Sequence, residues 1–163
     1  MRTEDFERLF EEHAGPLLGF LVYRTGDRVQ AEDIVAATFE KALLARRRFD
    51  RRRASEKTWL YTIALNCLRD EVRRAHAGAR ADARLRATVP PSPSDAWAAE
   101  IADRDELSAA MASLAPEERE AIALRYGADL TVREVARVAG VAETTAQGRV
   151  YRGLRKLREY LDE

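Results

Sequence analysis

The chain of 163 residues has one cysteine, two histidines and no apolar run long enough to cross a membrane. A lone Cys67 excludes an intrachain disulfide framework and a cysteine-based zinc site, so a reducing cytoplasm is the expected compartment. Residues 1–12 are acidic and amphipathic, unlike a secretory signal. His13 and His76 lack metal-ligand spacing, and no phosphate-binding glycine loop occurs. We therefore expect no metal, no cofactor and no enzymatic activity.

The chain also lacks an excess of either charge, because 28 basic and 28 acidic side chains balance to zero. The charges are unevenly placed. Residues 1–76 hold 15 basic and 13 acidic side chains, whereas residues 105–163 hold 9 and 11. A neutral total argues against a non-specific nucleic-acid coat. It permits specific binding through local patches, or a partner that supplies most of the affinity.

What the chain does have is clearest in residues 130–157, where the apolar spacing predicts two short helices joined by a turn at Gly140. The expected buried positions are Leu130, Val135, Val138, Ala146, Val150, Leu154 and Leu157. Any small helical hairpin could show this spacing. The polar face of the second helix favours a helix-turn-helix that enters a DNA groove, because it mixes amide, phenol and guanidinium groups. Residues 149–158 also hold five basic side chains and no acid.

The first half of the chain predicts helices at about Thr3–His13, Leu17–Arg24, Arg28–Ala45 and Glu56–His76. In the third helix we expect Ala31, Ile34, Val35, Thr38, Phe39, Ala42 and Leu43 to be buried. In the fourth we expect Trp59, Leu60, Ile63, Ala64, Cys67, Leu68 and Val72 to form a core stripe. Tyr61, Asn66, Arg69, Arg73 and Arg74 should then lie on or near the exposed side.

Between these two helices, residues 46–57 hold seven basic and two acidic side chains around Phe49. Most charge runs of this kind are solvated loops. This one precedes Ser55, a good helix cap, and a helix with rings, an amide and arginines. Such a combination suits single-stranded DNA, because rings receive an unstacked base and guanidinium groups hold phosphates.

From His76 to Trp97 the periodicity is lost, and the segment contains glycine and several prolines. Ser94 or Asp95 can cap a helix to about Leu114, and Pro116 can open another that ends at Gly127. No strand pattern or internal repeat occurs. The expected fold is all-α, with two small helical domains at residues 1–77 and 97–163 and a flexible linker at residues 78–96.

Taken in order, these motifs resemble bacterial RNA polymerase sigma factors of the extracytoplasmic-function (ECF, group IV) type of the sigma-70 family, over nearly the whole chain. AEDIVAATFEKAL (31–43) resembles the family's core-polymerase-binding helix, and TWLYTIALNCLRDEVRR (58–74) its promoter-melting helix. Residues 114–157 resemble its upstream-element-binding domain. The resemblance implies a region 2-like domain and a region 4-like helix-turn-helix domain. It also implies three partners, namely core RNA polymerase, promoter DNA and an anti-sigma factor.

The resemblance also implies a role for particular residues. The polymerase-binding residues would be Glu32, Asp33, Phe39 and Glu40. The contacts with the downstream element, including a pocket for a flipped non-template base, would be Phe49, Arg51, Arg52, Arg53, Lys57, Tyr61, Ile63, Asn66, Arg69, Arg73 and Arg74. The contacts with the upstream element would be Thr144, Gln147, Gly148, Arg149, Tyr151, Arg152 and Arg155.

The chain departs from the family pattern at three places. Ala36-Ala37 stands where Gln-Glu or Gln-Asp is usual, Ala142 replaces a capping serine, and Gly148 replaces a common serine. Loss of the cap costs about 1 kcal/mol unless Thr144 substitutes for it. Two alternatives therefore stay open. Ala36-Ala37 is compatible with a sigma-like decoy that binds only proteins, and the helix-turn-helix alone is compatible with a stand-alone regulator.

Overall fold

The computed structural model describes residues 1–86, 106–107 and 109–163. All regular elements in these residues are helical, which confirms the predicted all-α class. The chain divides into two units, Met1–Pro91 and Ser92–Glu163, and each is described by itself. Among the described residues, no helix combines the length and the apolar character that a membrane span requires.

Helix α1 (Thr3–Thr25) is continuous, so the prediction of two helices separated before Pro16 is wrong. Pro16 has no N–H group to donate to the carbonyl of Glu12, and a proline inside a helix costs about 3 kcal/mol. Leu9, Leu17 and Leu21 are nevertheless almost fully buried on one side of the same helix. Burying each of these side chains contributes about 1.5–3 kcal/mol, so their sum outweighs the proline.

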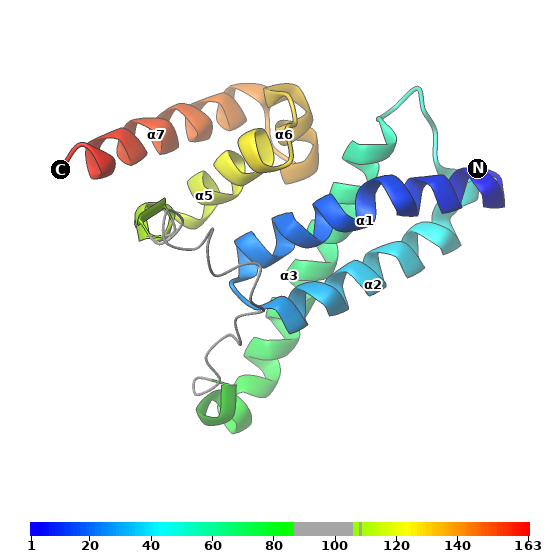
Figure 1. Ribbon diagram of the computed structural model, residues 1–163, viewed down its shortest axis with the longest axis horizontal. Coiled ribbons are helices and arrows are strands. Elements are labelled where there is room, and N and C mark those ends of the chain that lie inside the picture. Colours follow the sequence, from blue (N-terminus) through cyan, green and yellow to red (C-terminus); the bar gives the residue numbers. More distant parts are fainter. Residues whose placement is uncertain (87–105, 108) are drawn as a thin grey trace. The chain divides into compact units, whose positions relative to one another are not determined.

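Helix α2 (Arg28–Ala45) has the predicted bounds, and the Asp27 carboxylate caps it by accepting from the Gln30 N–H at 3.2 Å. Helices α1, α2 and α3 (Glu56–Arg86) pack on one another in the first unit (Figure 1). The core is rich in rings: the buried rings of Phe20 and Tyr61 lie 5.2 Å apart, centroid to centroid. At its edge, the half-exposed ring of Phe10 lies 4.8 Å from the buried ring of Phe39. This core is what positions the basic loop between α2 and α3.

Two positions predicted to be buried are exposed. Leu43 is 40% exposed and Val72 is 42% exposed. On α2 the buried stripe passes through Thr38 and Ala42, so Leu43 lies one position off its centre. On α3 the side chains from Val72 to Gly78 are all exposed, which places Val72 at the end of the packed part of that helix.

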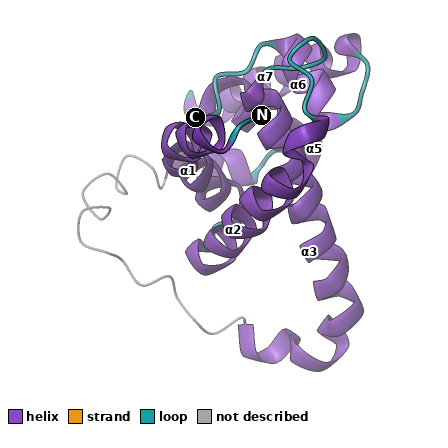
Figure 2. Cartoon of the chain, turned by 90° about the vertical axis from the view of Figure 1, so that its right-hand side faces the viewer, coloured by secondary structure: helices purple, strands orange, loops and turns teal. Residues whose placement is uncertain are grey.

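Helix α3 is longer than predicted, because residues 77–86 continue it into the segment expected to be a linker. Figures 1 and 2 both show the end of α3 running past α1 and α2. The segment AHAGARADARLR is dominated by alanine and arginine, which are strong helix formers. Periodicity does not predict this part, because its sequence lacks an apolar stripe at helical spacing.

The second unit contains α5 (Pro116–Ile122), the π-helical segment η2 (Ala123–Gly127), α6 (Val132–Ala139) and α7 (Glu143–Leu161). The predicted start at Pro116 and end at Gly127 are confirmed. Before α5, the Arg119 guanidinium donates to the carbonyls of Met111, Ala112 and Leu114 at 2.9, 3.1 and 3.1 Å. The helix predicted from residue 94 lies largely outside the described residues, although residues 109–112 are helical.

The predicted helix-turn-helix is confirmed in α6 and α7. Thr131 caps α6 by accepting from the Glu134 N–H at 3.2 Å, and Gly140 ends α6 in the left-handed region at φ 71°. Of the predicted buried positions, all but Leu154 are buried. Gly153, which the sequence did not single out, allows α5 and α7 to approach closely, because a Cβ there would lie 2.7 Å from Cγ1 of Ile122.

Candidate nucleic-acid interfaces

The outer face of α7 carries the residues predicted for the upstream element. Thr144, Gln147, Tyr151, Arg152 and Arg155 are exposed on this face, and Gly148 and Arg149 are partly buried. The opposite side of α7 packs on α5 and α6 through small and aliphatic residues. The structure therefore brings the predicted upstream residues together on one helix that is held by its packing, as groove binding requires.

The start of α7 has no side-chain cap. Ala142 occupies the N-cap position, and neither it nor Thr144 accepts a hydrogen bond from the first turn. The first backbone N–H groups of α7 are thus left to water or to an acceptor from outside the chain.

The basic stripe of residues 149–158 is partly neutralised from beneath. Glu118 of α5 is a buried acid, 7% exposed. Lys156 Nζ donates to both its carboxylate oxygens at 3.0 and 2.9 Å, and Arg152 Nε lies 3.8 Å from its Oε1. Lys156 therefore belongs to an ion pair with the core and not to a free cationic stripe. Sequence spacing could not indicate this pair, because its members are 38 residues apart.

The basic loop at residues 49–55 is anchored at both ends. At its start the Phe49 ring lies 4.8 Å from the Trp59 ring, centroid to centroid, at 43°. At its end Ser55 Oγ accepts from the Thr58 N–H at 3.1 Å, which confirms the predicted cap. Between these anchors the side chains of Arg51, Arg52 and Arg53 are exposed. The loop thus presents cations from a defined position.

On α3, Asn66, Arg73 and Arg74 are exposed as predicted, and Ile63 and Arg69 are partly exposed. Tyr61 is not: it is 1% exposed, and its ring packs edge-on against Phe20 at 5.2 Å. This burial raises the pKa of Tyr61 to about 12. The prediction that Tyr61 lies on the exposed side is therefore wrong. It failed because α3 is covered by both α1 and α2, which makes its buried stripe wider than one face.

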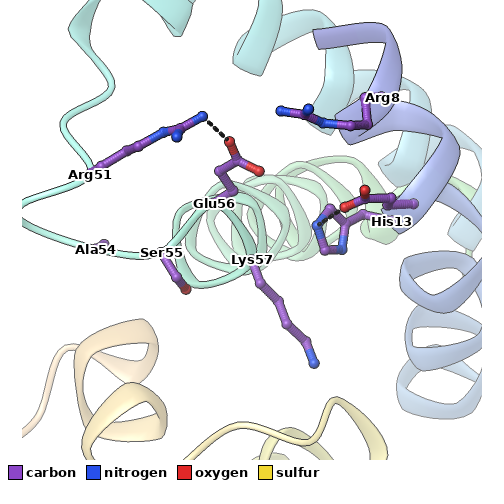
Figure 3. Close-up of a pocket in the computed structure, with 8 residues that line it drawn as sticks. Arg8, His13, Arg51, Ala54, Ser55, Glu56 and Lys57 are labelled. Carbon is purple, nitrogen blue, oxygen red and sulfur yellow. Dashed lines mark hydrogen bonds and ion pairs between the residues drawn. The ribbon is translucent and has the colours of Figure 1, made fainter. Parts of the chain in front are cut away.

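A hollow of about 560 Å³ lies between α1 and the loop (Figure 3). Its lining consists of Arg8, Glu12, His13, Arg51, Ala54, Ser55, Glu56 and Lys57. In Figure 3, Arg8 and Arg51 approach Glu56 from opposite sides, and Arg51 pairs with Glu56 at 3.1 Å. Arg51 and Lys57 belong to the predicted downstream set. The contribution of α1 was missed, since no local pattern links segments that lie this far apart in the sequence.

The charges of this hollow are mixed. The pKa of His13 is lowered, mainly because the ring is partly buried. The Glu12 and Glu56 carboxylates oppose this shift, and Lys57 adds to it. The lining therefore offers hydrogen-bond donors and acceptors side by side, as the edge of a nucleic-acid base requires. Among residues 1–86, 106–107 and 109–163, no cluster of histidine, cysteine or acidic side chains could hold a metal ion.

The predicted polymerase-binding residues lie on α2 and divide into two kinds. Glu32, Asp33 and Glu40 are exposed. Phe39 is 6% exposed and packs against Phe10. It therefore supports α2 from the core and is not accessible to a partner. Nearby on α2, Leu44 is 78% exposed.

Two family models cover most of the chain. Residues 9–77 match Sigma-70 region 2, and residues 104–157 match Sigma-70, region 4. RNA polymerase sigma factor CarQ of Myxococcus xanthus is 34% identical over 162 residues, which cover 97% of this chain and 90% of CarQ. The chain belongs to the sigma-70 family. ECF RNA polymerase sigma factor RpoE of Cereibacter sphaeroides is 31% identical, and the match covers 96% of this chain and 86% of that protein.

Solved structures agree with this assignment. The sigma factor RpoE in complex with the anti-sigma factor NepR, from Bartonella quintana, matches with a TM-score of 0.80 at 25% identity, over 98% of each chain. CnrH in complex with the cytosolic domain of CnrY matches in fold with a TM-score of 0.73 at 23% identity, over 99% of this chain and 90% of that one. The chain is thus an ECF sigma factor, a protein that directs RNA polymerase to promoters. Its α2 and α3 belong to region 2, and its helix-turn-helix belongs to region 4.

Proposed function

We propose that this sigma factor reads the upstream promoter element with the outer face of α7 and captures melted bases of the downstream element with the loop at residues 49–55 and the exposed side of α3. The observation that carries the proposal is the outer face of α7. It exposes an amide, a phenol and guanidinium groups directly opposite a packed side. These groups address base edges and phosphates.

In the downstream element, we assign the flipped base to the loop side of region 2. Phe49 and Trp59 supply rings, Asn66 supplies an amide, and the exposed arginines of the loop supply phosphate contacts. The hollow beside Arg51 and Lys57 is large enough to accept a base. Tyr61 is left out of this assignment because Phe20 covers its ring.

Core RNA polymerase would bind the exposed residues of α2, and its binding is needed for the energetics. Opening DNA costs about 1.4 kcal/mol per stacking step. Each captured base returns about 1–3 kcal/mol. Because Ala36 and Ala37 supply no polar contact, we propose that Glu32, Asp33 and Glu40 provide the polar part of this interface. The factor would act in the cytoplasm, as a DNA-recognition subunit and not as an enzyme.

We also propose a protein inhibitor. Both solved relatives described above are complexes, one of them named with an anti-sigma factor. An anti-sigma factor of this chain would cover the surfaces that bind polymerase and DNA.

Transcription reconstituted with core polymerase tests the proposal. The templates are start sites mapped after induced expression of the factor. We expect initiation only when factor and core are both present, and we expect it to be reduced in Arg152→Ala and Asn66→Ala. Arg158→Ala, an exposed arginine on α7 outside the predicted set, is the matched control.

The same reagents separate the alternatives. A decoy would co-purify with core polymerase and support no promoter footprint in the complex. A stand-alone regulator would shift duplex DNA tightly without polymerase. If Arg152→Ala and Asn66→Ala both left start-site selection unchanged in a working holoenzyme, the assignment of these surfaces to DNA would be wrong.

A further inference from the structure

The guanidinium of Arg152 lies back along α7, over the position of Gly148. A Cβ added at Gly148, one turn earlier, would be 3.0 Å from Nη1 of Arg152. On the other side, Arg152 Nε is 3.8 Å from Oε1 of Glu118. The side chain is still 50% exposed, so one edge of it faces outward. Arg152 is thus bounded by an acid on one side and by the space of a missing side chain on the other.

The acid on the inner side has a fixed place. The Glu118 side chain is 9% exposed, and Lys156 holds both of its oxygens from the next turn of α7. A carboxylate held in this way cannot follow Arg152 outward. Its attraction is also stronger than that of an exposed acid, because it is largely removed from water.

We propose that Glu118 and Gly148 form a seat for the Arg152 guanidinium, and that this seat determines how Arg152 meets the upstream promoter element. The inference rests on the proposed function of the α7 outer face. A guanidinium is a planar fork of donors, so its orientation selects which pair of acceptors it can address. Glu118 is then a positioning residue, and Gly148 determines specificity through the space that it leaves.

The seat competes with a simpler interpretation. An ion pair at 3.8 Å with a half-exposed arginine contributes little by itself, and glycine in a helix is merely a weak helix former. On that interpretation, alanine at Gly148 would leave promoter choice unchanged. On the seat interpretation it would displace Arg152, because the three nearest atoms that a Cβ there meets all belong to that side chain.

A double-mutant cycle in the full holoenzyme distinguishes the two. Gly148→Ala, Arg152→Ala and the double variant are assayed with core polymerase on a promoter recovered by transcript mapping and on its single-base-pair variants. We expect Gly148→Ala to reduce initiation about fivefold and to change preference at the same base pair as Arg152→Ala, since a good bidentate contact discriminates by at least this factor. In the Arg152→Ala background it should have no further effect.

Two controls isolate the seat. Gly19→Ala adds the same methyl group to an exposed helical glycine with nothing within 4 Å, and Arg158→Ala removes an exposed cation of α7 that lies outside the predicted upstream set. Glu118→Gln approaches the seat from the other side, with thermal unfolding as a check because it also weakens the Lys156 pair. Gly148→Ala does not touch that pair, so the cycle remains decisive if Glu118→Gln fails to fold.

The outcomes are separable. An equal effect of Gly148→Ala with and without Arg152, or no effect at all, overturns the seat and leaves the α7 assignment standing. If Arg152→Ala leaves the promoter preference of an active holoenzyme unchanged, the proposed role of this arginine fails. The proposed seat then fails with it.

Discussion

The helices α3 and α7 each carry a tyrosine that the family resemblance places against DNA. In the structure one of these tyrosines is buried and the other is exposed. Tyr61 is 1% exposed, whereas Tyr151 is 67% exposed. On α7 the buried positions Ala146, Val150, Gly153 and Leu157 form a narrow stripe. On α3 they come in adjacent pairs, such as Leu60 with Tyr61. A helix with a narrow core stripe keeps a whole face for a ligand, and a helix with a wide one does not.

The same contrast applies to the cations. Around the basic loop, Arg53 is 89% exposed and its nearest acid, Asp50, is 4.0 Å away. Under α7, a buried acid holds Lys156 and borders Arg152. Exposed pairs contribute little and are easily exchanged for phosphate. The loop therefore suits a flexible single strand, and the α7 face suits a duplex of fixed geometry.

The largest expected effect comes from truncating the two tyrosines, the buried one on α3 and the exposed one on α7. Tyr61→Ala should lower the free energy of unfolding by about 3–5 kcal/mol, as for other buried aromatic rings. Tyr151→Ala should change it by less than about 0.5 kcal/mol. Chemical denaturation of the full chain measures both, and hydrogen exchange assigns the loss to α1–α3. Equal costs would mean that Tyr61 is not packed in solution and could face DNA after all.

Alkaline pH provides the next largest effect. The pKa of Tyr61 is raised from 10.0 to about 12 in the folded chain, so the folded state keeps a proton that the unfolded state loses. Stability is unaffected below pH 10 and decreases as the pH rises toward 12, by up to about 2.7 kcal/mol from this group. Unfolding free energies measured from pH 9 to 12 should show this loss relative to Tyr61→Phe. Parallel curves for the two proteins would contradict the burial.

A pair of glycines on α7 gives a smaller effect with opposite signs. Gly153→Ala forces a Cβ to within 2.7 Å of Ile122 Cγ1, and overpacking of this kind costs about 1–3 kcal/mol. A gain in helix propensity of up to about 1 kcal/mol offsets part of that cost. The three nearest atoms to a Cβ at Gly148 belong to the end of the flexible Arg152 side chain, so Gly148→Ala should stabilise the fold by up to about 1 kcal/mol. Thermal unfolding of both variants measures the two changes in unfolding temperature. Changes of the same sign would disprove the close approach of α5 and α7.

The smallest effect on stability is expected at Phe49. Phe49→Ala removes a ring pair that contributes about 0.5–1.5 kcal/mol beyond its buried area. It should nevertheless reduce promoter opening, detected as reactivity of unpaired thymines, and leave the footprint on the upstream element intact. The ring of Phe6 on α1 lies 6.3 Å from that of Phe39 on α2, so Phe6→Ala controls for the loss of an aromatic pair elsewhere in this unit. Normal opening in Phe49→Ala would separate the loop from base capture.

The sequence predicts most of the fold because local signals were consistent. Asp27, Ser55 and Gly140 mark helix ends by their own chemistry, and the helix-turn-helix has a regular stripe. The failures have a common cause. The local chemistry of Pro16 predicts a helix boundary, although burial of leucines on both sides of it keeps α1 continuous. The end of α3 lacks an apolar stripe, so its sequence predicts no helix there.

The candidate sites were predictable only as far as they are local. The outer face of α7 follows from helical periodicity, and the loop follows from its composition. The Glu118–Lys156 pair, the α1 side of the hollow and the burial of Tyr61 depend on contacts between distant segments. Such contacts decide which charges are free, and no spacing rule within one helix contains them.

Arg119 has a consequence for the durability of region 4. By binding three carbonyl oxygens, it closes the turn that leads into α5 with a side chain. The turn that leads into α5 is therefore held by a planar fork of donors. Lysine, with one compact ammonium in place of a fork, could not hold all three oxygens in the same way.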